Sequence, residues 1–190
     1  MPLTVTLEIS DPELDHFRSV MRRTRARAAE RSTQEIAAVA RGTVERLASG
    51  THSPFVVNRL RKVKALIGML EDAEWQLPEP GRTRVLEGLA YIAESHDLVP
   101  DDVPVLGLVD DAIMIELVLR ELRHELESYE EFDEFRREEA ARRGAAGSHK
   151  AVSHEDWLGL QRRALHDRIR ERRERDLERG APDFELITRL

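Results

Sequence analysis

The chain has 190 residues, which suits one domain, or one domain with an appended helix. Charged residues make up 35% and aromatic residues 5%, which favours a helical protein with long solvated faces over a β-sandwich. No cysteine is present, so disulfides, thiolate zinc sites and cysteine nucleophiles are excluded. The N-terminal residues show no basic region followed by an apolar stretch, so no signal peptide is expected and a cytoplasmic location is predicted.

The net charge of −7 is distributed unevenly along the chain. Residues 1–70 carry +5, residues 71–135 carry −15 and residues 136–190 carry +3. We expect the two basic ends to pack on the acidic centre and neutralise it. A nucleic-acid-binding domain would present one dominant basic face, so nucleic acid is not expected as a partner.

The first half of the chain shows one strand pattern followed by helical patterns. Residues 3–9 alternate between apolar and polar side chains, which predicts a β-strand. Apolar residues then recur at helical spacing, which predicts helices at about 11–30, 32–49, 53–70 and 81–95. Ser32 and Glu35 have the spacing of a capping box at the start of the second helix. The sequence LPEPG at residues 77–81 predicts a break before the fourth.

The longest helix is predicted from about Leu108 to Arg137. Its apolar stripe consists of Ile115, Val118, Leu122, Leu126, Tyr129 and Phe132. Residues 141–152 are predicted to be a linker. A C-terminal helix follows, and its first half is expected to bury an apolar stripe of Trp157, Leu160, Ala164 and Ile169. Its second half, residues 170–179, is expected to project into solvent because almost all of its side chains are charged.

These patterns predict an all-α fold, a compact bundle of about five helices with a short N-terminal strand and an appended charged C-terminal helix. The helical domain is expected over residues 1–140, and the C-terminal helix and tail over residues 153–190. The strand needs a partner for its unpaired backbone groups. We expect it to pair with residues 184–190, either within one chain or exchanged between two chains.

Residues 96–120 combine strong hydrophobicity with two pairs of aspartates. The sequence DLVPD at 97–101, followed by VPVLGLVDD at 103–111 and preceded by LAY at 89–91, resembles the YkvA-like family (DUF1232). The match rests mainly on residues 89–116, within a core of about 55–130. Because that bacterial domain family has no known function, the resemblance implies no activity.

The aspartates of this segment are the main candidates for chemistry. They are Asp97, Asp101, Asp102, Asp110 and Asp111. Several carboxylates beside His96 suit Mg²⁺, Mn²⁺ or Ca²⁺, which prefer oxygen ligands. The same residues suit capping, because the first N–H groups of a helix need acceptors. We expect Asp101 and Asp110 to accept such backbone hydrogen bonds, and a divalent-metal site is the alternative.

A second spacing of interest is the Glu-x-x-His formed by Glu121 and His124, which is typical of di-iron carboxylate bundles. Glu116 and Glu87 are possible further carboxylates, but such sites need two of these motifs. His124 lies opposite the apolar stripe of its helix, so we expect it to face solvent. The arginines within residues 18–31 are expected to form a solvated helix face rather than a phosphate site.

Three functions follow as hypotheses. The first is a non-catalytic interaction or scaffold protein, whose partner is another protein or a second copy of the chain. The second is a metal-dependent enzyme or metal-binding protein that uses the aspartates of residues 97–111. The third is a peripheral membrane adaptor that uses the apolar segment. A transmembrane segment is not expected, because residues 98–119 contain five carboxylates that are costly to bury in lipid.

Overall fold

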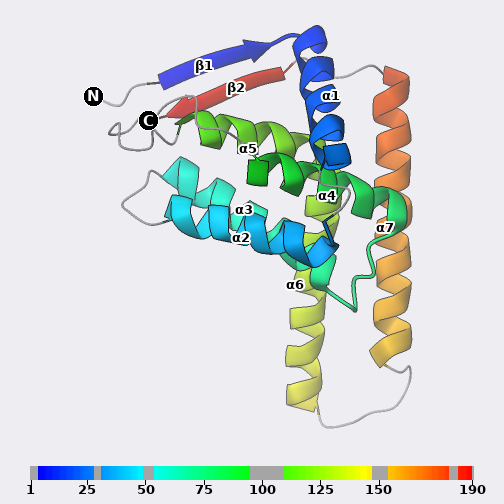
Figure 1. The fold of residues 1–190 in the computed structure, drawn as a ribbon. Coiled ribbons are helices and arrows are strands. Elements are labelled where there is room, and N and C mark those ends of the chain that lie inside the picture. The colour runs from blue at the N-terminus through cyan, green and yellow to red at the C-terminus, as the bar shows by residue number, and fades with distance from the viewer. Residues whose placement is uncertain are drawn as a thin grey trace.

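The computed structural model describes residues 4–27, 31–48, 54–94, 109–146, 154–179 and 184–189. Seven helices and two short strands form this part of the chain (Figure 1). The strands are β1 (Thr4–Ile9) and β2 (Phe184–Arg189). The helices are α1 (Asp11–Arg27), α2 (Thr33–Ala48), α3 (Pro54–Glu71), α4 (Glu79–Glu94), α5 (Val109–Glu121), α6 (Arg123–Ala146) and α7 (His154–Arg179).

The core lies among α2, α3, α4, α5, the first half of α6 and one face of α7. Helix α1 packs against α4, and α2 lies against both α3 and α4. Fully buried aliphatic side chains fill the space between these helices, among them Val44, Val63, Leu66, Leu89 and Leu122. Burying one side chain of this size contributes about 1.5–3 kcal/mol. The prediction of a helical fold is confirmed, and the packing of these apolar stripes stabilises it.

Helix α2 begins with the predicted capping box. The backbone N–H of Glu35 donates to the Ser32 hydroxyl at 3.2 Å, and the backbone N–H of Ser32 donates to the Glu35 carboxylate at 2.5 Å. The two bonds satisfy backbone donors that the helix itself leaves unpaired. This helix start is therefore specified locally.

The connection between α3 and α4 is held by Asp72. Its Oδ1 accepts hydrogen bonds from two backbone N–H groups that follow it, at 2.8 and 3.1 Å. Its Oδ2 accepts from the Tyr129 hydroxyl at 3.1 Å and from Arg136 at 2.9 Å. Gln76 adopts a left-handed conformation with φ of 49° where the turn ends. The connection is therefore attached to α6, and it places Trp75 in the core at 0% exposure.

The segment predicted as one long helix consists of two helices, α5 and α6. Figure 1 shows α6 leaving the core in a different direction from α5. The hydrogen bonds from Leu122 N to Val118 O and from Leu126 N to Leu122 O, both 3.0 Å, carry the chain across the boundary. Helix α6 also continues to Ala146, past the start of the predicted linker. Residues 147–153 lie outside the described part, and the division into domains stays a prediction.

Helix α7 packs beside α6, but not with the predicted stripe. Leu158, Leu165 and Ile169 are buried, whereas Trp157 and Leu160 are 40% and 53% exposed. The residues predicted to be buried therefore lie about one position before those that are buried, although Ile169 belongs to both sets. The contacts of the whole helix decide which face of α7 turns towards the core, and its charged half contributes many of these contacts.

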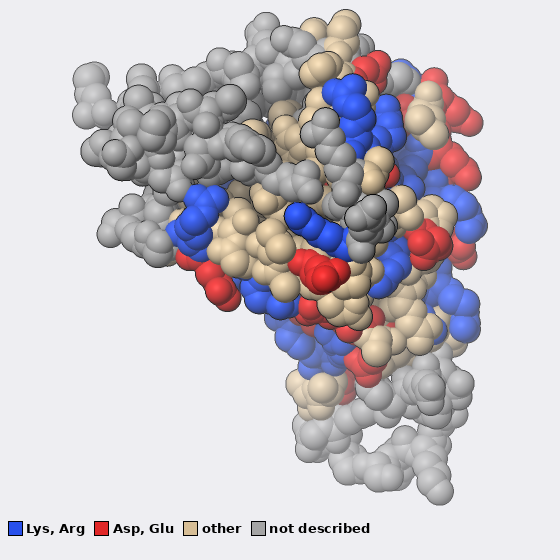
Figure 2. Space-filling view, viewed as in Figure 1, with Lys and Arg blue, Asp and Glu red and all other residues tan. Residues whose placement is uncertain are grey.

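The charged second half of α7 lies along α6 and does not project into solvent. Arg172 donates to Glu127 at 2.9 Å, and Arg168, which lies just before this half, donates to Glu131 at 2.6 Å. Exposed pairs of this kind contribute only about 0–1 kcal/mol each, so they orient α7 more than they stabilise it. The prediction of a solvated projection was wrong because α6 supplies complementary carboxylates. Figure 2 shows the resulting mixture of basic and acidic side chains on this side of the molecule.

The two strands form an antiparallel pair in which Thr4 lies opposite Arg189 and Ile9 lies opposite Phe184. This register brings the two ends of the chain side by side (Figure 1). It agrees with the pairing expected within one chain, and exchange between two chains stays a prediction.

Removal of residues 183–190 is expected to lower the melting temperature or to promote aggregation. The deletion would leave the backbone N–H and C=O groups of β1 without partners, and an unpaired strand edge readily associates with other chains. Thermal denaturation and size-exclusion chromatography measure the two effects. An unchanged melting temperature together with an unchanged elution volume would contradict a stabilising role for this pair.

Candidate binding pocket

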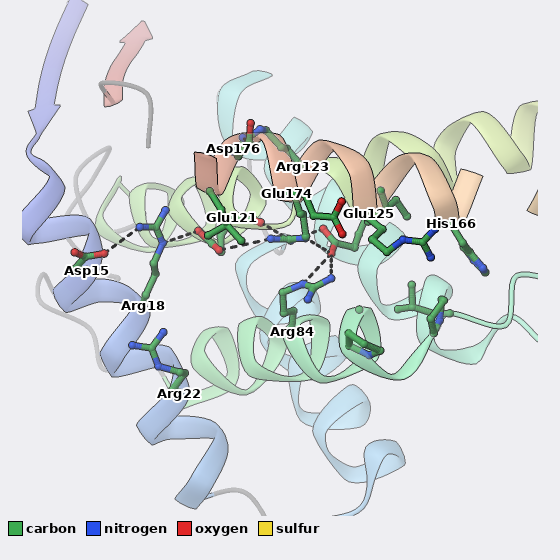
Figure 3. Close-up of a pocket in the computed structure, with 18 residues that line it drawn as sticks. Asp15, Arg18, Arg22, Arg84, Glu121, Arg123, Glu125, His166, Glu174 and Asp176 are labelled. Carbon is green, nitrogen blue, oxygen red and sulfur yellow. Dashed lines mark hydrogen bonds and ion pairs between the residues drawn. The ribbon is translucent and has the colours of Figure 1, made fainter. Parts of the chain in front are cut away.

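A pocket of about 710 Å³ is formed by α1, the start of α4, the junction of α5 and α6, and the second half of α7 (Figure 3). Its volume lies within the range of about 300–1,000 Å³ that is usual for ligand sites. Six arginines line it, namely Arg18, Arg22, Arg84, Arg123, Arg170 and Arg173. Five carboxylates face them, namely Asp15, Glu121, Glu125, Glu174 and Asp176. The remaining lining is mainly apolar.

Glu125 lies at the centre of this charged lining and is 0% exposed. Arg84 donates to its Oε1 through Nε at 2.9 Å and through Nη2 at 2.8 Å. From the other side, Arg173 donates through Nε at 2.7 Å and through Nη2 at 2.6 Å. Burial raises the pKa of Glu125, but the hydrogen bonds and positive charges of Arg173 and Arg84 outweigh it and hold the pKa below its ordinary value. Glu125 is thus a buried, ionised carboxylate.

The charged row continues from Glu125 to α1. Arg173 also donates to the backbone oxygen of Glu121 at 2.9 Å, and its Nη1 lies 3.9 Å from the Glu121 carboxylate. Arg18 donates to the other carboxylate oxygen of Glu121 at 3.0 Å and to Asp15 at 3.1 Å. Figure 3 shows the resulting row of alternating charges. The row joins α1, α5, α7, α6 and α4, so the pocket wall is tied to five helices.

His124 lies beneath α7 in the same region. It is 9% exposed, and its Nε2 lies 2.7 Å from Oδ2 of Asp176, with which Arg123 also pairs. Burial raises the pKa of Asp176, but the hydrogen bond from His124 and the charge of Arg123 outweigh it, so the pKa is lowered. The prediction that His124 faces solvent was wrong, because α7 covers this side of α6. Glu121, its partner in the metal-like spacing, is engaged by arginines.

His166 lines the pocket on α7 and packs edge-on against Trp75, with ring centroids 4.4 Å apart. Burial lowers the pKa of His166 to about 4, and the positive charge of Arg162 acts in the same direction. The imidazole is therefore neutral near pH 7. Its Nε2 and the indole Nε1 of Trp75 are both buried without a hydrogen-bond partner among the residues that the structure describes.

Protonation of His166 is expected to make folding stability depend on pH. Its pKa is about 6.5 in the unfolded chain and about 4 in the folded protein. The unfolded chain therefore takes up this proton first, so the stabilisation is complete above pH 6.5 and is lost as the pH falls towards 4. His166→Gln should reduce the loss in unfolding free energy between pH 7 and pH 5, as measured by urea denaturation.

The control for this experiment is His16→Gln, which changes an exposed histidine on α1. It should leave the difference between pH 7 and pH 5 as it is in the unmodified protein. Equal pH dependence in all three proteins would show that His166 titrates normally in the folded state.

None of the five aspartates predicted from the sequence has a side chain in the part of the chain that the structure describes. Asp97, Asp101 and Asp102 lie outside the described residues. Asp110 and Asp111 fall in the first turn of α5, but their side chains are also outside the described set. Within the described ranges no cluster of three or more metal-binding side chains is present. The capping role and the divalent-metal site both stay predictions.

Sequence reasoning missed the pocket because its residues come from separate helices. One local signal was present: Glu125 falls between Leu122 and Leu126, within the stripe predicted to be buried. A carboxylate at a buried position requires a cationic partner. Its two partners lie 41 and 48 residues away in the chain, so no local pattern identifies them.

Comparison with known proteins is informative for one segment. Residues 83–117 match the model of a family described as "Protein of unknown function (DUF1232)". The matched segment runs from α4 into α5 and includes Arg84 of the pocket. It supports the domain family that the sequence resembles, whereas the name YkvA-like and a bacterial origin stay predictions. No curated protein and no solved structure matches the chain.

The length and hydropathy of the helices also bear on whether they can cross a membrane. Of the helices that the structure describes, none has both the length and the hydropathy needed to cross a bilayer.

Proposed function

We propose that this chain is a non-catalytic interaction protein and that the pocket lined by α1, α4 and α7 is its binding site for a protein partner. The main support is the row of ion pairs at the pocket floor. Glu125 and Glu121 are held by arginines from three other helices, at 2.6 to 3.0 Å. Such a network favours one geometry, which suits recognition of a partner by a preorganised surface.

The protonation behaviour of the pocket also favours binding over acid–base catalysis. A general acid or base works best when its pKa lies near the operating pH. The pKa of Glu125 is below its ordinary value, and that of His166 is lowered to about 4. Glu125 therefore remains ionised and His166 remains neutral near pH 7. Neither group is poised to exchange a proton during turnover at that pH.

The rim of the pocket is accessible to another protein. Leu177 on α7 is 84% exposed although it lines the pocket, and Arg22 on α1 is exposed as well. An apolar side chain of this size gains free energy, at about 25 cal/mol per Å², when a partner removes it from water. The rim thus provides one apolar contact on α7 and one cationic contact on α1.

Site-specific photo-crosslinking in cells tests this proposal. A benzophenone amino acid placed at Leu177 should capture a discrete protein adduct, because this position borders the pocket. The same amino acid at Arg175, which is exposed on α7 but does not line the pocket, is the matched control. Adducts from position 177 that are absent from position 175 are expected. The same adducts from both positions, or none from position 177, would contradict the proposal.

A further inference from the structure

The cations of the pocket differ in how far they are neutralised. Arg18, Arg84 and Arg173 belong to the row of ion pairs, and Arg123 pairs with Asp176. Arg22 lies one turn after Arg18 on α1 and lines the pocket, yet it forms no ion pair among the described residues. Within the described part of the chain no carboxylate occupies the donors of its guanidinium, which makes Arg22 the lining arginine best suited to a ligand.

The charge of the lining limits the kind of anion that fits. Arg170 pairs with Asp167 outside the lining and His166 is neutral near pH 7, so Arg22 supplies the single positive charge of the lining that no described carboxylate pairs with. Glu174 on α7 lines the pocket without an ion pair in the described part of the chain, and would repel a second negative charge. A group with a single negative charge, such as a carboxylate, therefore complements the site better than a doubly charged phosphate does.

An apolar wall lies next to these charges. Leu77 and Pro78 contribute to it from just before α4, Pro80 contributes from the first turn of α4, and Ile169 and Leu177 contribute from α7. Ile169 is buried by the fold, whereas Leu177 is largely exposed. A ligand that covers this wall must carry an apolar group beside its negative charge.

We infer, resting on the function proposed above, that the pocket recognises an acidic segment of the partner protein that carries a large apolar side chain beside a carboxylate. The carboxylate binds Arg22, whose planar guanidinium can donate two parallel hydrogen bonds to it. The apolar side chain packs against Leu177 and the prolines at the start of α4. Arg22 is thereby the residue that selects for a negative charge, and Leu177 the residue that selects for an apolar group.

Two fluorescent dyes separate these two contributions. 1-Anilinonaphthalene-8-sulfonate carries one negative charge on an apolar body, and N-phenyl-1-naphthylamine is the same body without the charge. The anionic dye should bind the full-length protein more tightly, and Arg22→Glu should weaken it by about tenfold, which corresponds to about 1.4 kcal/mol. Arg22→Glu should leave the neutral dye unaffected, and Leu177→Asp should weaken both dyes. Arg175→Glu, the same charge change outside the pocket, should affect neither.

A peptide competitor tests whether the ligand is a protein segment. An acetylated and amidated peptide with a single glutamate between leucines should displace the anionic dye, whereas its counterpart with glutamine for glutamate should not. If the dye binds through Arg22 but the acidic peptide fails to displace it, the site takes small anions and the inference of a partner segment is overturned.

The outcomes also distinguish this inference from the proposed function. Equal affinity for both dyes, with loss of both in Leu177→Asp, would overturn the selection for a negative charge and leave a binding pocket in place. Dye binding that no pocket variant changes would overturn the inference and the proposed binding site together.

Discussion

Replacement of Arg173 by alanine is expected to lower the free energy of unfolding by about 3 kcal/mol, at the lower end of the range for breaking a buried ion pair. Glu125 is 0% exposed, and it would keep only the two hydrogen bonds from Arg84. The charge of Glu125 would then be buried with incomplete compensation. Urea denaturation monitored by circular dichroism measures the change.

The matched control is Arg170→Ala on the same face of α7. Arg170 is exposed and pairs with Asp167, three residues earlier in the same helix, so its loss should change the free energy of unfolding by at most about 0.5 kcal/mol. A similar small loss for Arg173→Ala would mean that the network contributes no more than an exposed ion pair.

A double-mutant cycle identifies the source of the Arg173 effect. Adding Glu125→Gln to Arg173→Ala removes the buried charge, so the double variant should be more stable than the sum of the single losses predicts.

The dependence of the unfolding free energy on pH below 4.5 gives an independent check on the role of Glu125. Because the pKa of Glu125 is below 4.5 in the folded protein, its stabilisation is complete above pH 4.5 and is lost as the pH falls through the lower folded value. Glu125→Gln should reduce this loss of unfolding free energy at low pH.

The second large effect is expected for Trp75→Ala, which should cost about 3–5 kcal/mol. The indole is 0% exposed, and its ring centroid lies 5.1 Å from that of Phe132, 5.6 Å from that of Tyr129 and 4.4 Å from that of His166. The side chain thus joins the α3–α4 connection to α6 and α7, and its removal leaves a large cavity between three elements.

Trp157→Ala is the control, because Trp157 is 40% exposed and contacts Phe135 at a centroid distance of 5.8 Å. We expect a loss of at most about 1 kcal/mol for this partly exposed side chain. The chain contains two tryptophans, so each variant retains one as its fluorescence probe. If the two losses were equal, the buried Trp75 would contribute no more to stability than the partly exposed Trp157 does.

The opposite charges of the chain's ends and centre proved to be the most useful sequence signal for the tertiary arrangement. The basic N-terminal part contributes Arg18 and the basic C-terminal part contributes Arg168 and Arg173, and these side chains pair with carboxylates of α5 and α6. The expectation that the ends neutralise the centre is confirmed for the described residues. Net charge over long segments can be read directly from composition, because it does not depend on which face of a helix is buried.

Local features could also be predicted from the sequence alone. The Ser32–Glu35 capping box and the helical spacing of Val63, Ile67 and Leu70 depend on residues only a few positions apart. Interactions over such short distances are available to the chain whatever it packs against, so the helix positions and the start of α2 follow from the sequence.

The pocket required long-range packing that no local pattern contains. Periodicity placed His124 in solvent and Trp157 in the core, but α7 docks with Leu165 and Ile169 inward and covers His124. Glu125 becomes an acceptable buried residue only when Arg84 and Arg173 arrive from two other helices, because an unpaired buried carboxylate would be too costly. The orientation of α7 is therefore a property of the assembled helices, since it depends on ion pairs and apolar contacts that form only when the helices meet.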